Sequence, residues 1–285
     1  MIKKDPVFEP SEKIPDGYLS GSRDQLSESG ILEHLRYRDA LRVEWRQTVT
    51  STNALLRERV REPEGLVLAA NEQTAGSGRL GRKFHSPQDT GIYFSLLLKP
   101  ESANAKTTLI TPMAAVAVCR AIREVTGKNA QIKWVNDIYL DGKKVCGILT
   151  QASFSRENSQ PDYVILGIGI NVYRPGEGFP EELEKIAGSI EDKPQWDLKN
   201  RLLASVLNHF WDLYQHFDRQ AIADEYKSYS FVIGKDVWII SPTDKVAATV
   251  LDIDVNCNLI VRDEEGRIDT LSSNEISIRV HPGNS

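Results

Sequence analysis

Runs of apolar residues predict several buried strands in the first two thirds of the chain. Leu41–Trp45 alternates apolar and polar positions, as a strand with one buried face does. Three further runs are apolar almost throughout, which is typical of central strands buried on both faces: Leu66–Ala70, Gly91–Leu98 and Tyr163–Val172. Within the last run, Gly167 and Gly169 share one face. Their lack of side chains leaves room there for a ligand or, equally, for a packed helix.

Between these runs, apolar residues recur at helical spacing. Leu109–Val125 predicts a helix that ends at Gly127, the usual position of a C-terminal cap. Trp196–Phe217 predicts a second, amphipathic helix. His209 and His216 lie on it, and we interpret both as surface residues because two histidines alone do not make a metal site. A shorter helical pattern covers Ile31–Leu35.

A β-hairpin is predicted around Asp141-Gly142, because this dipeptide joins two strand-like runs, Ile132–Leu140 and Lys143–Leu149. A two-residue turn fixes three cross-strand pairs: Leu140 with Lys143, Tyr139 with Lys144 and Asp137 with Cys146.

This register places Lys144 and Asp137 diagonally on one side of the hairpin, within reach of one ligand, while Lys143 points to the other side. The alternative is a solvated ion pair of little energetic value. An acid and a base on one face of a largely apolar hairpin favour a binding site.

Beyond Phe231 the pattern changes to short apolar runs separated by turns. Five short strands in about 50 residues predict a small β-barrel. The clearest runs are Val237–Ile240, Val246–Leu251, Leu259–Val261 and Ile276–Ile278. We place a domain boundary near residue 230.

Composition excludes several classes of protein. The chain has 285 residues, of which 40% are hydrophobic and 26% charged, and this indicates two domains with a sizeable core. A net charge of −5 disfavours non-specific nucleic-acid binding as the main activity. Cys119, Cys146 and Cys257 are odd in number and widely spaced, so they indicate neither disulfides nor a metal site. The absence of a long apolar run or signal peptide predicts a cytoplasmic protein without membrane contact.

The densest group of candidate binding residues lies in the loop Asn71–Phe84. It contains three glycines and three cationic side chains: Gly76, Gly78, Gly81, Arg79, Arg82 and Lys83. Glycine lets the backbone approach a ligand, and arginine presents donors to phosphate and carboxylate oxygens. We therefore predict that the loop closes over an anionic small molecule. A solvated structural loop is the alternative.

The spacing Gly-x-Gly-x-x-Gly in this loop also occurs in dinucleotide-binding folds. Those folds need a helix that opens at the third glycine. Pro87 and Gly91 follow closely and argue against a helix there, so we reject this interpretation.

The polar residues Ser51-Thr52-Asn53 directly precede a helical pattern, and they have two interpretations. We favour a helix N-cap, in which these side chains satisfy the first free N–H groups of the helix. The alternative is that they bind a polar ligand beside the helix N-terminus. Asn171, on the glycine-bearing face of its strand, could also hydrogen-bond a ligand.

Four separated motifs, in the same order, resemble those of the biotin protein ligases. The resemblance covers residues 42–280. The motifs are Ser51-Thr52-Asn53, the loop Gln73–Arg82, the segment Lys133–Asp137 with Lys144 and Gly147–Leu149, and Gly167–Asn171. One motif alone would be a weak signal, whereas four in order are highly specific. The segment Glu275–Arg279 also resembles the C-terminal part of that family.

The resemblance implies an α+β fold. A mixed β-sheet flanked by helices would form the catalytic domain (41–230), and an SH3-like β-barrel would follow (231–285), with residues 1–40 as a lead-in or remnant linker. It also implies a two-step reaction. Biotin and MgATP give biotinyl-5′-AMP and pyrophosphate, and a lysine of a biotin carboxyl carrier protein then attacks the mixed anhydride. The carrier would belong to acetyl-CoA carboxylase or another biotin-dependent carboxylase.

The same resemblance implies roles for individual residues. Lys144 and Arg79 would be catalytic, because Lys144 would hold the biotin carboxylate and the α-phosphate, and Arg79 lies in the loop over the adenylate. The implied biotin-binding residues are Ser51, Thr52, Asn53, Gln73, Ser77, Gly78, Arg79 and Lys144. The implied ATP-binding residues are Arg82, Phe84, Lys133, Asn136, Asp137, Asn171 and Arg279. No side-chain cage for a metal is implied, and Asp137 is the candidate contact for Mg²⁺.

Two departures from the family pattern affect the loop. Ser77 replaces the first arginine of the usual Gly-Arg-Gly-Arg, and Phe84 stands where a tryptophan is usual, which keeps a stacking face but removes the indole N–H. Because Ser77 removes a donor to phosphate or carboxylate, we predict that biotinyl-AMP escapes faster from the native protein than from Ser77→Arg. The measurement is the adenylate dissociation rate, and equal rates would contradict the prediction.

Some family members carry an N-terminal winged helix-turn-helix that represses the biotin operon. Here residues 1–22 are rich in Pro, Gly and charge and predict an irregular lead-in, and no helix with a basic recognition face precedes Ser51. We therefore expect a ligase that lacks this module and does not bind DNA. A bifunctional ligase/repressor, a lipoate ligase and a non-catalytic biotin sensor remain as alternatives, and a homodimer remains open.

Overall fold

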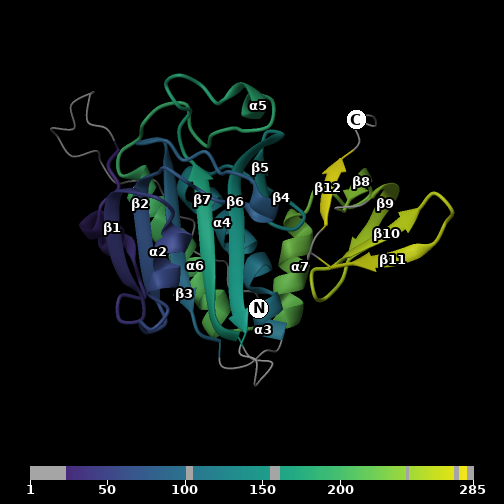
Figure 1. Ribbon diagram of the computed structural model, residues 1–285, viewed down its shortest axis with the longest axis horizontal. Helices are drawn as coiled ribbons and strands as arrows, with labels where there is room; N and C mark the ends of the chain where they lie inside the picture. The colour runs from purple at the N-terminus through teal and green to yellow at the C-terminus, as the bar shows by residue number, and fades with distance from the viewer. Residues whose placement is uncertain (1–23, 101–104, 155–160, 242–243, 273–275, 281–285) are drawn as a thin grey trace, which may run out of the picture.

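The computed structural model describes residues 24–100, 105–154, 161–241, 244–272 and 276–280, and within them it contains two β-sheets (Figure 1). The first is a seven-stranded mixed sheet of order β1-β2-β3-β7-β6-β5-β4. Its strands are β1 (Arg42–Val49), β2 (Leu66–Gln73), β3 (Gly91–Leu98), β4 (Gln131–Lys133), β5 (Asp137–Leu140), β6 (Lys143–Phe154) and β7 (Pro161–Asn171). β1 and β2 run parallel, and the other described neighbours are antiparallel. The predicted mixed sheet is confirmed.

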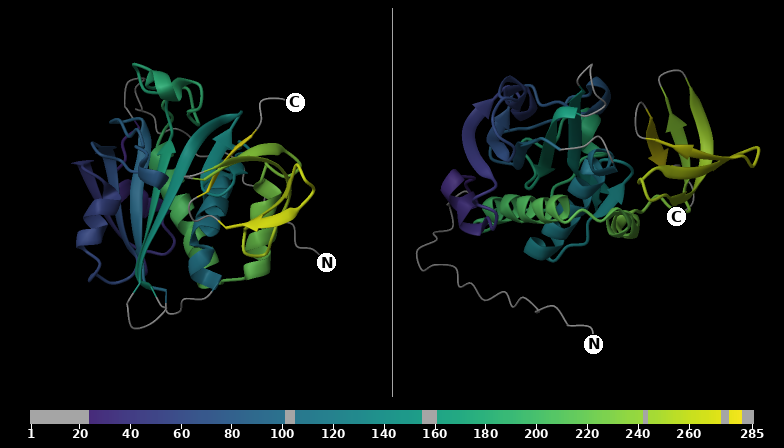
Figure 2. Two further views of the ribbon diagram at one scale, coloured as in Figure 1. Left: turned by 45° about the vertical axis from the view of Figure 1, so that its right-hand side comes forward. Right: turned by 90° about the horizontal axis from the view of Figure 1, so that it is seen from below.

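Helices cover the two faces of this sheet unequally. The described helices are α1 (Glu28–His34), α2 (Thr52–Glu58), α3 (Ala105–Thr108), α4 (Ile110–Thr126), α5 (Glu181–Glu184), α6 (Leu198–Gln215) and α7 (Arg219–Tyr229), with a short 3-10 turn, η1 (Arg79–Gly81). The long helices α4 and α6 pack together on one face, and the short α2 contacts β3 and β7 on the other (Figures 1 and 2). Much of the second face is therefore left for a binding site.

The alternation of side chains explains why two separate apolar clusters form. On β3, Phe94 and Leu96 belong to the main core with α4 and α6, whereas Leu97 joins a smaller cluster with Leu56 of α2. Both faces of β3 are therefore buried, as its continuous apolar run predicts, and its bounds are those predicted. The helix predicted over Leu109–Val125 is also confirmed as α4, whose C-cap Gly127 adopts the left-handed conformation with φ of 72°.

The predicted single strand Ile132–Leu140 is wrong, because β4 ends at Lys133 and β5 begins at Asp137. Asn136 leaves the ladder between them, since its side-chain Nδ2 donates to the Ile148 carbonyl and its own carbonyl accepts from the Ile148 N–H. A turn thus replaces the middle of the run and brings β4 back against β5.

The predicted register of the hairpin is correct only near the turn. Leu140 pairs with Lys143 and Tyr139 with Lys144, as predicted. A bulge between Ile138 and Tyr139 then shifts the pairing, so that Asp137 lies opposite Gly147 and not opposite Cys146. The bulge adds one residue to β6, which simple turn counting does not include.

Residues 24–40 pack closely on α6. Leu26, Ile31 and Leu35 are buried in the main core. The Ser27 N–H donates to Asn200 Oδ1, and Ser27 Oγ caps α1 by accepting from the Gly30 N–H. The predicted irregular lead-in, residues 1–22, lies outside the described residues, and the boundaries at residues 41 and 231 stay predictions.

The second sheet is antiparallel and lies beside α7 (Figures 1 and 2). Its order is β11-β10-β9-β8-β12, with β8 (Asp236–Ile240), β9 (Lys245–Ile253), β10 (Leu259–Asp263), β11 (Ile268–Leu271) and β12 (Ser277–Val280). The five predicted short strands are confirmed. Trp134 Nε1 donates to the Cys257 carbonyl over 2.8 Å, which links this sheet to the β4–β5 turn. None of the helices in the described part of the chain is long and apolar enough to cross a membrane.

A polar contact between α4 and α6 makes stability depend on pH. Glu124 Oε2 lies 2.6 Å from His209 Nε2 and accepts from Ser205 Oγ, and these contacts lower the pKa of Glu124 to about 2. The carboxylate is partly exposed, so Glu124→Gln should lower the free energy of unfolding by no more than about 1 kcal/mol at pH 7.

The sign of this effect follows from the lowered pKa. The carboxylate contributes its stability above its unfolded pKa of about 4.3 and loses it as pH falls through the folded value. Denaturant unfolding at pH 7 and near pH 2.5 should therefore show a difference between native protein and Glu124→Gln that shrinks with acid. A difference of equal size at both pH values would contradict this account.

Candidate active site

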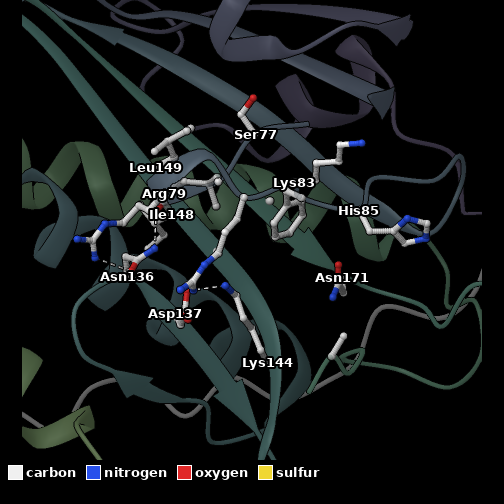
Figure 3. Close-up of a pocket in the computed structure, with 18 of the residues that line it drawn as sticks. Ser77, Arg79, Lys83, His85, Asn136, Asp137, Lys144, Ile148, Leu149 and Asn171 are labelled. Carbon is white, nitrogen blue, oxygen red and sulfur yellow. Dashed lines mark hydrogen bonds and ion pairs between the residues drawn. The ribbon is translucent and has the colours of Figure 1, made fainter. Parts of the chain in front are cut away.

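A cavity of about 580 Å³ opens over the part of the sheet that α2 leaves uncovered (Figure 3). Its wall combines the loop after β2, the β4–β5 turn, the facing strands β6 and β7, and the start of β12. The site thus draws on both sheets. Its size is typical of small-molecule sites in proteins.

Glycines on the facing strands form the floor. Gly147 and Gly169 are directly opposed in the β6–β7 ladder. The ring of Phe84 lies over them, since a Cβ at Gly169 would come within 2.4 Å of that ring and one at Gly147 within 3.0 Å. Gly167 is occupied from above by helix α2, where a Cβ would lie 2.1 Å from Asn53 Oδ1. The packed-helix alternative is therefore confirmed at Gly167, whereas at Gly169 the space holds the side chain of Phe84.

The loop that carries Phe84 folds back on itself over the cavity. The Phe84 N–H donates to the Gly76 carbonyl, and the Gly78 N–H donates to the Arg82 carbonyl. The chain reverses through Gly81, whose φ of 72° favours glycine. The 3-10 turn η1 is followed by β3 without an intervening α-helix, which confirms that the dinucleotide-binding interpretation was correctly rejected.

Lys144 and Asp137 form an ion pair inside the cavity, with Nζ and Oδ1 2.6 Å apart (Figure 3). The predicted shared face is thus confirmed despite the register shift. The Lys144 backbone is fixed by hydrogen bonds to Ile186 and Gly188. Lys143 points away, and its Nζ donates to the carbonyls of Glu184 and Lys185. The Lys144 side chain is 32% exposed, so its ammonium is accessible to a ligand.

Arg79 reaches from the loop to the β4–β5 turn and to the second sheet. Its Nη1 donates to Asn136 Oδ1 over 3.2 Å, and its Nη2 donates to the Ile276 carbonyl over 3.4 Å (Figure 3). Burial lowers the pKa of Arg79, and it also lowers the pKa of Lys133 on β4. Arginine stays protonated in proteins nonetheless.

Charge in the cavity is strongly unbalanced. Among the described residues that line it, one carboxylate, Asp137, faces six cationic side chains: Arg79, Arg82, Lys83, Lys133, Lys144 and Arg279. The protein as a whole has a net charge of −5, so this concentration is local. Such a site favours an anionic ligand with several charges.

The polar wall at the start of α2 corrects the N-cap interpretation. Ser51 is the N-cap residue, but its side chain makes no cap hydrogen bond. Gln73 of β2 supplies the cap, because its Oε1 accepts from the Thr52 N–H over 2.9 Å and lies 3.1 Å from Thr52 Oγ1. The cap therefore comes from a neighbouring strand, and the side chains of Ser51, Thr52 and Asn53 line the cavity.

Comparison with known proteins places both sheets in one family. Residues 44–171 match the biotin/lipoate A/B protein ligase family, and residues 232–279 match the biotin protein ligase C terminal domain. A biotin protein ligase from Aquifex aeolicus, solved in complex with biotin and ATP, is 30% identical with a TM-score of 0.68. The match covers 84% of this chain and 99% of that one. The chain belongs to the biotin protein ligase family.

Curated members of the biotin protein ligase family differ in how much of their length is matched. The bifunctional ligase/repressor BirA of Bacillus subtilis is 41% identical over 160 residues, which is 55% of this chain and 46% of that protein. The biotin–[acetyl-CoA-carboxylase] ligase of Mycobacterium tuberculosis is 29% identical over 255 residues, covering 81% and 89%. The chain thus spans about half the length of the BirA relatives that it matches.

The cavity brings together every residue that the resemblance to biotin protein ligases singled out. Those residues are Ser51, Thr52, Asn53, Gln73, Ser77, Gly78, Arg79, Arg82, Phe84, Lys133, Asn136, Asp137, Lys144, Asn171 and Arg279. They come from segments far apart in the sequence. Their individual roles toward biotin, ATP or Mg²⁺ stay predictions.

Sequence reasoning missed one apolar wall of the cavity. It is lined by Phe179, Leu183, Ile186 and Ala187, from α5 and the segments on either side of it. This stretch has no strand or helix periodicity that would predict burial, because its apolar residues stand among Pro, Gly and Glu. The pairing of Lys144 with Ala187 brings the segment to the site. Only the tertiary fold reveals it.

Proposed function

We propose that this protein activates biotin with ATP and transfers it to a lysine of a biotin carboxyl carrier protein. The observation that carries the proposal is the convergence of Lys144, Asp137 and Arg79 over a glycine floor, beside a buried polar wall. The related Aquifex aeolicus structure contains biotin and ATP, which supports both as ligands here. The related Mycobacterium tuberculosis protein is named for acetyl-CoA carboxylase, which supports a carboxylase subunit as the carrier.

In the first step a carboxylate oxygen of biotin attacks the α-phosphorus of ATP. A carbon–oxygen–phosphorus anhydride forms, and pyrophosphate leaves with the electrons of the broken bond. Two anions must approach, so the site needs fixed positive charge and no covalent nucleophile of its own. Lys144 neutralises the carboxylate and the α-phosphate. Arg79 adds a second positive charge from the loop over the cavity.

In the second step the lysine amine of the carrier attacks the carbonyl carbon of the anhydride. An amide bond forms, AMP leaves, and the amine loses a proton. Lys144 remains beside the departing phosphate, where its charge stabilises the leaving group. The exposed position of the loop residues Arg82 and Lys83 lets the carrier approach from that side.

The two ends of the cavity suit the two substrates. Three buried residues, Ser51, Thr52 and Asn53, and the half-buried Gln73 offer hydrogen-bonding groups for the ureido ring of biotin. Phe84, which we assign to ATP, packs against the glycine floor and offers an apolar ring face to the nucleotide. Ser77, Gly78 and Lys144 complete the set for the biotin carboxylate.

The nucleotide end of the site contains the remaining cations and amides. Arg82, Lys133, Asn136, Asn171 and Arg279 line it and provide donors for phosphates and base. Mg²⁺, when bound with ATP, would neutralise phosphate oxygens. Asp137 fits a single contact to it, because Mg²⁺ is usually held by one or two carboxylates together with substrate phosphates. Among the described residues, no group of three or more metal-ligating side chains forms a cage.

The proposal also covers the location, the domain organisation and the partners of the protein. We propose a cytoplasmic protein with a catalytic unit over residues 41–230 and a second unit over 231–285. The Bacillus subtilis relative is named a ligase/repressor, whereas we propose that this chain does not bind DNA. A gel shift with a biotin operator would contradict that proposal. A homodimer remains open, and the molar mass in solution decides it.

A lipoate ligase is the second candidate, because the matching family model covers biotin and lipoate ligases together. Mass spectrometry of a carrier protein incubated with this protein and ATP separates the two. We expect a biotin adduct on one carrier lysine. When lipoate replaces biotin, we expect no adduct on the carrier. A lipoyl adduct without a biotin adduct would contradict the proposal.

A further inference from the structure

Ser95 on β3 lies behind the polar wall of the cavity and does not line it. Its side chain is fully buried. Its Oγ lies 2.7 Å from Thr52 Oγ1 and 2.5 Å from Asn53 Oδ1. It is thus the hydroxyl that ties together two neighbouring side chains of the wall.

Ser95 Oγ is the donor in both of these hydrogen bonds. The Ser95 hydroxyl has one proton, and the carboxamide oxygen of Asn53 can only accept. The Ser95 proton is therefore shared between Thr52 Oγ1 and Asn53 Oδ1, while Thr52 Oγ1 donates its own proton to Gln73 Oε1. Gln73 Oε1 thus accepts from both the hydroxyl and the N–H of Thr52, over 3.1 Å and 2.9 Å.

The Asn53 carboxamide is held from three sides. Its oxygen faces Ser95, and its Nδ2 donates to Gln151 Oε1 over 3.0 Å. It lies on Gly167, which is the cross-strand partner of Ser95. With its oxygen facing Ser95, the Asn53 carboxamide has Nδ2 as its donor end, while the Thr52 hydroxyl oxygen can accept. The wall then presents both donor and acceptor groups to a ligand.

We propose that Ser95 is a positioning residue that sets this donor and acceptor pattern and thereby selects a ligand with a cyclic urea. Such a ring offers two N–H donors on either side of one carbonyl acceptor, which complements lone pairs on Thr52 and an N–H on Asn53. The inference rests on the proposed function, because it concerns the biotin end of the same site. Without Ser95, the Thr52 hydroxyl oxygen loses its donor and the Asn53 carboxamide loses its anchor.

The test compares Ser95→Ala with Ser205→Ala, which removes a buried serine hydroxyl far from the cavity on α6. Biotin affinity is measured by calorimetric titration of the intact protein, and the KM for ATP by pyrophosphate exchange. We expect Ser95→Ala to weaken biotin binding about tenfold, in line with one disturbed buried hydrogen-bond group. The KM for ATP should stay within about twofold, and Ser205→Ala should match the native protein.

A double variant provides an independent reading. Because Ser95 acts through Asn53 as well as Thr52, Ser95→Ala should weaken biotin binding less in an Asn53→Ala background than in the native protein. Unchanged biotin affinity in Ser95→Ala, or an equal loss toward biotin and ATP, would overturn the role of Ser95. A native protein that does not bind biotin at all would overturn the proposed function itself, and with it this inference.

Discussion

Replacement of Lys144 by alanine should reduce biotin-dependent adenylation by about a thousandfold. The ammonium forms the 2.6 Å ion pair with Asp137 and is the cation that the hairpin holds on the cavity side. Without it, the biotin carboxylate and the α-phosphate approach as unshielded anions beside a carboxylate that has lost its partner. Removal of one preorganised donor at a charge-developing centre commonly costs two to three orders of magnitude in rate, that is, about 10²–10³. The measurement is the rate of pyrophosphate formation at saturating biotin and ATP.

Lys143→Ala is the matched control, because the neighbouring lysine has the same chemistry and points away from the cavity. We expect it to keep nearly the native adenylation rate. Thermal unfolding of both variants separates loss of activity from loss of fold. Equal activity in the two alanine variants would show that the ammonium inside the cavity is not part of the chemistry.

Replacement of Gly167 by alanine should weaken biotin binding by about a hundredfold while the KM for ATP changes little. The added methyl would lie 2.1 Å from Asn53 Oδ1, far inside van der Waals contact. Asn53 cannot move aside freely, because Ser95 and Gln151 hold both ends of its carboxamide. A shift of about 1 Å in a positioning group can cost about 10² in function. Calorimetric titration with biotin measures the loss.

Gly176→Ala serves as the control for this glycine, because no heavy atom lies within 4 Å of the added methyl. It should bind biotin as the native protein does. If Gly167→Ala also kept native affinity, then Asn53 would not contribute to the biotin site in the arrangement that the structure shows. If Gly167→Ala lost biotin and ATP binding together, then the substitution would have disturbed the sheet and not the polar wall.

Local sequence patterns were sufficient to predict the strands and helices that form the scaffold. The apolar run of β3 and the helical spacing of α4 reflect burial that repeats along one element, so periodicity reveals them. Asp141-Gly142 predicted the turn because its backbone conformation is a local property, and both residues have positive φ. The shared face of Lys144 and Asp137 followed from that turn.

Features that depend on distant segments were not predictable in the same way. The bulge in β6 shifts Asp137 to Gly147, and no residue type in the hairpin marks it. Gln73 replaces Ser51 as the helix cap because β2 ends beside α2, which only the sheet order determines. Ser95 stands in an apolar strand, where a single serine has no distinctive pattern. Its contacts with Thr52 and Asn53 exist only after β3 and α2 have packed.

The most direct test of the central claim is biotin-dependent exchange of labelled pyrophosphate into ATP by the native protein. The exchange reports reversible formation of biotinyl-5′-AMP and needs no carrier protein. We predict exchange that requires biotin, is not supported by lipoate and collapses in Lys144→Ala. Native protein without biotin-dependent exchange would contradict the account, and the catalytic roles of Lys144 and Arg79 would then be withdrawn together.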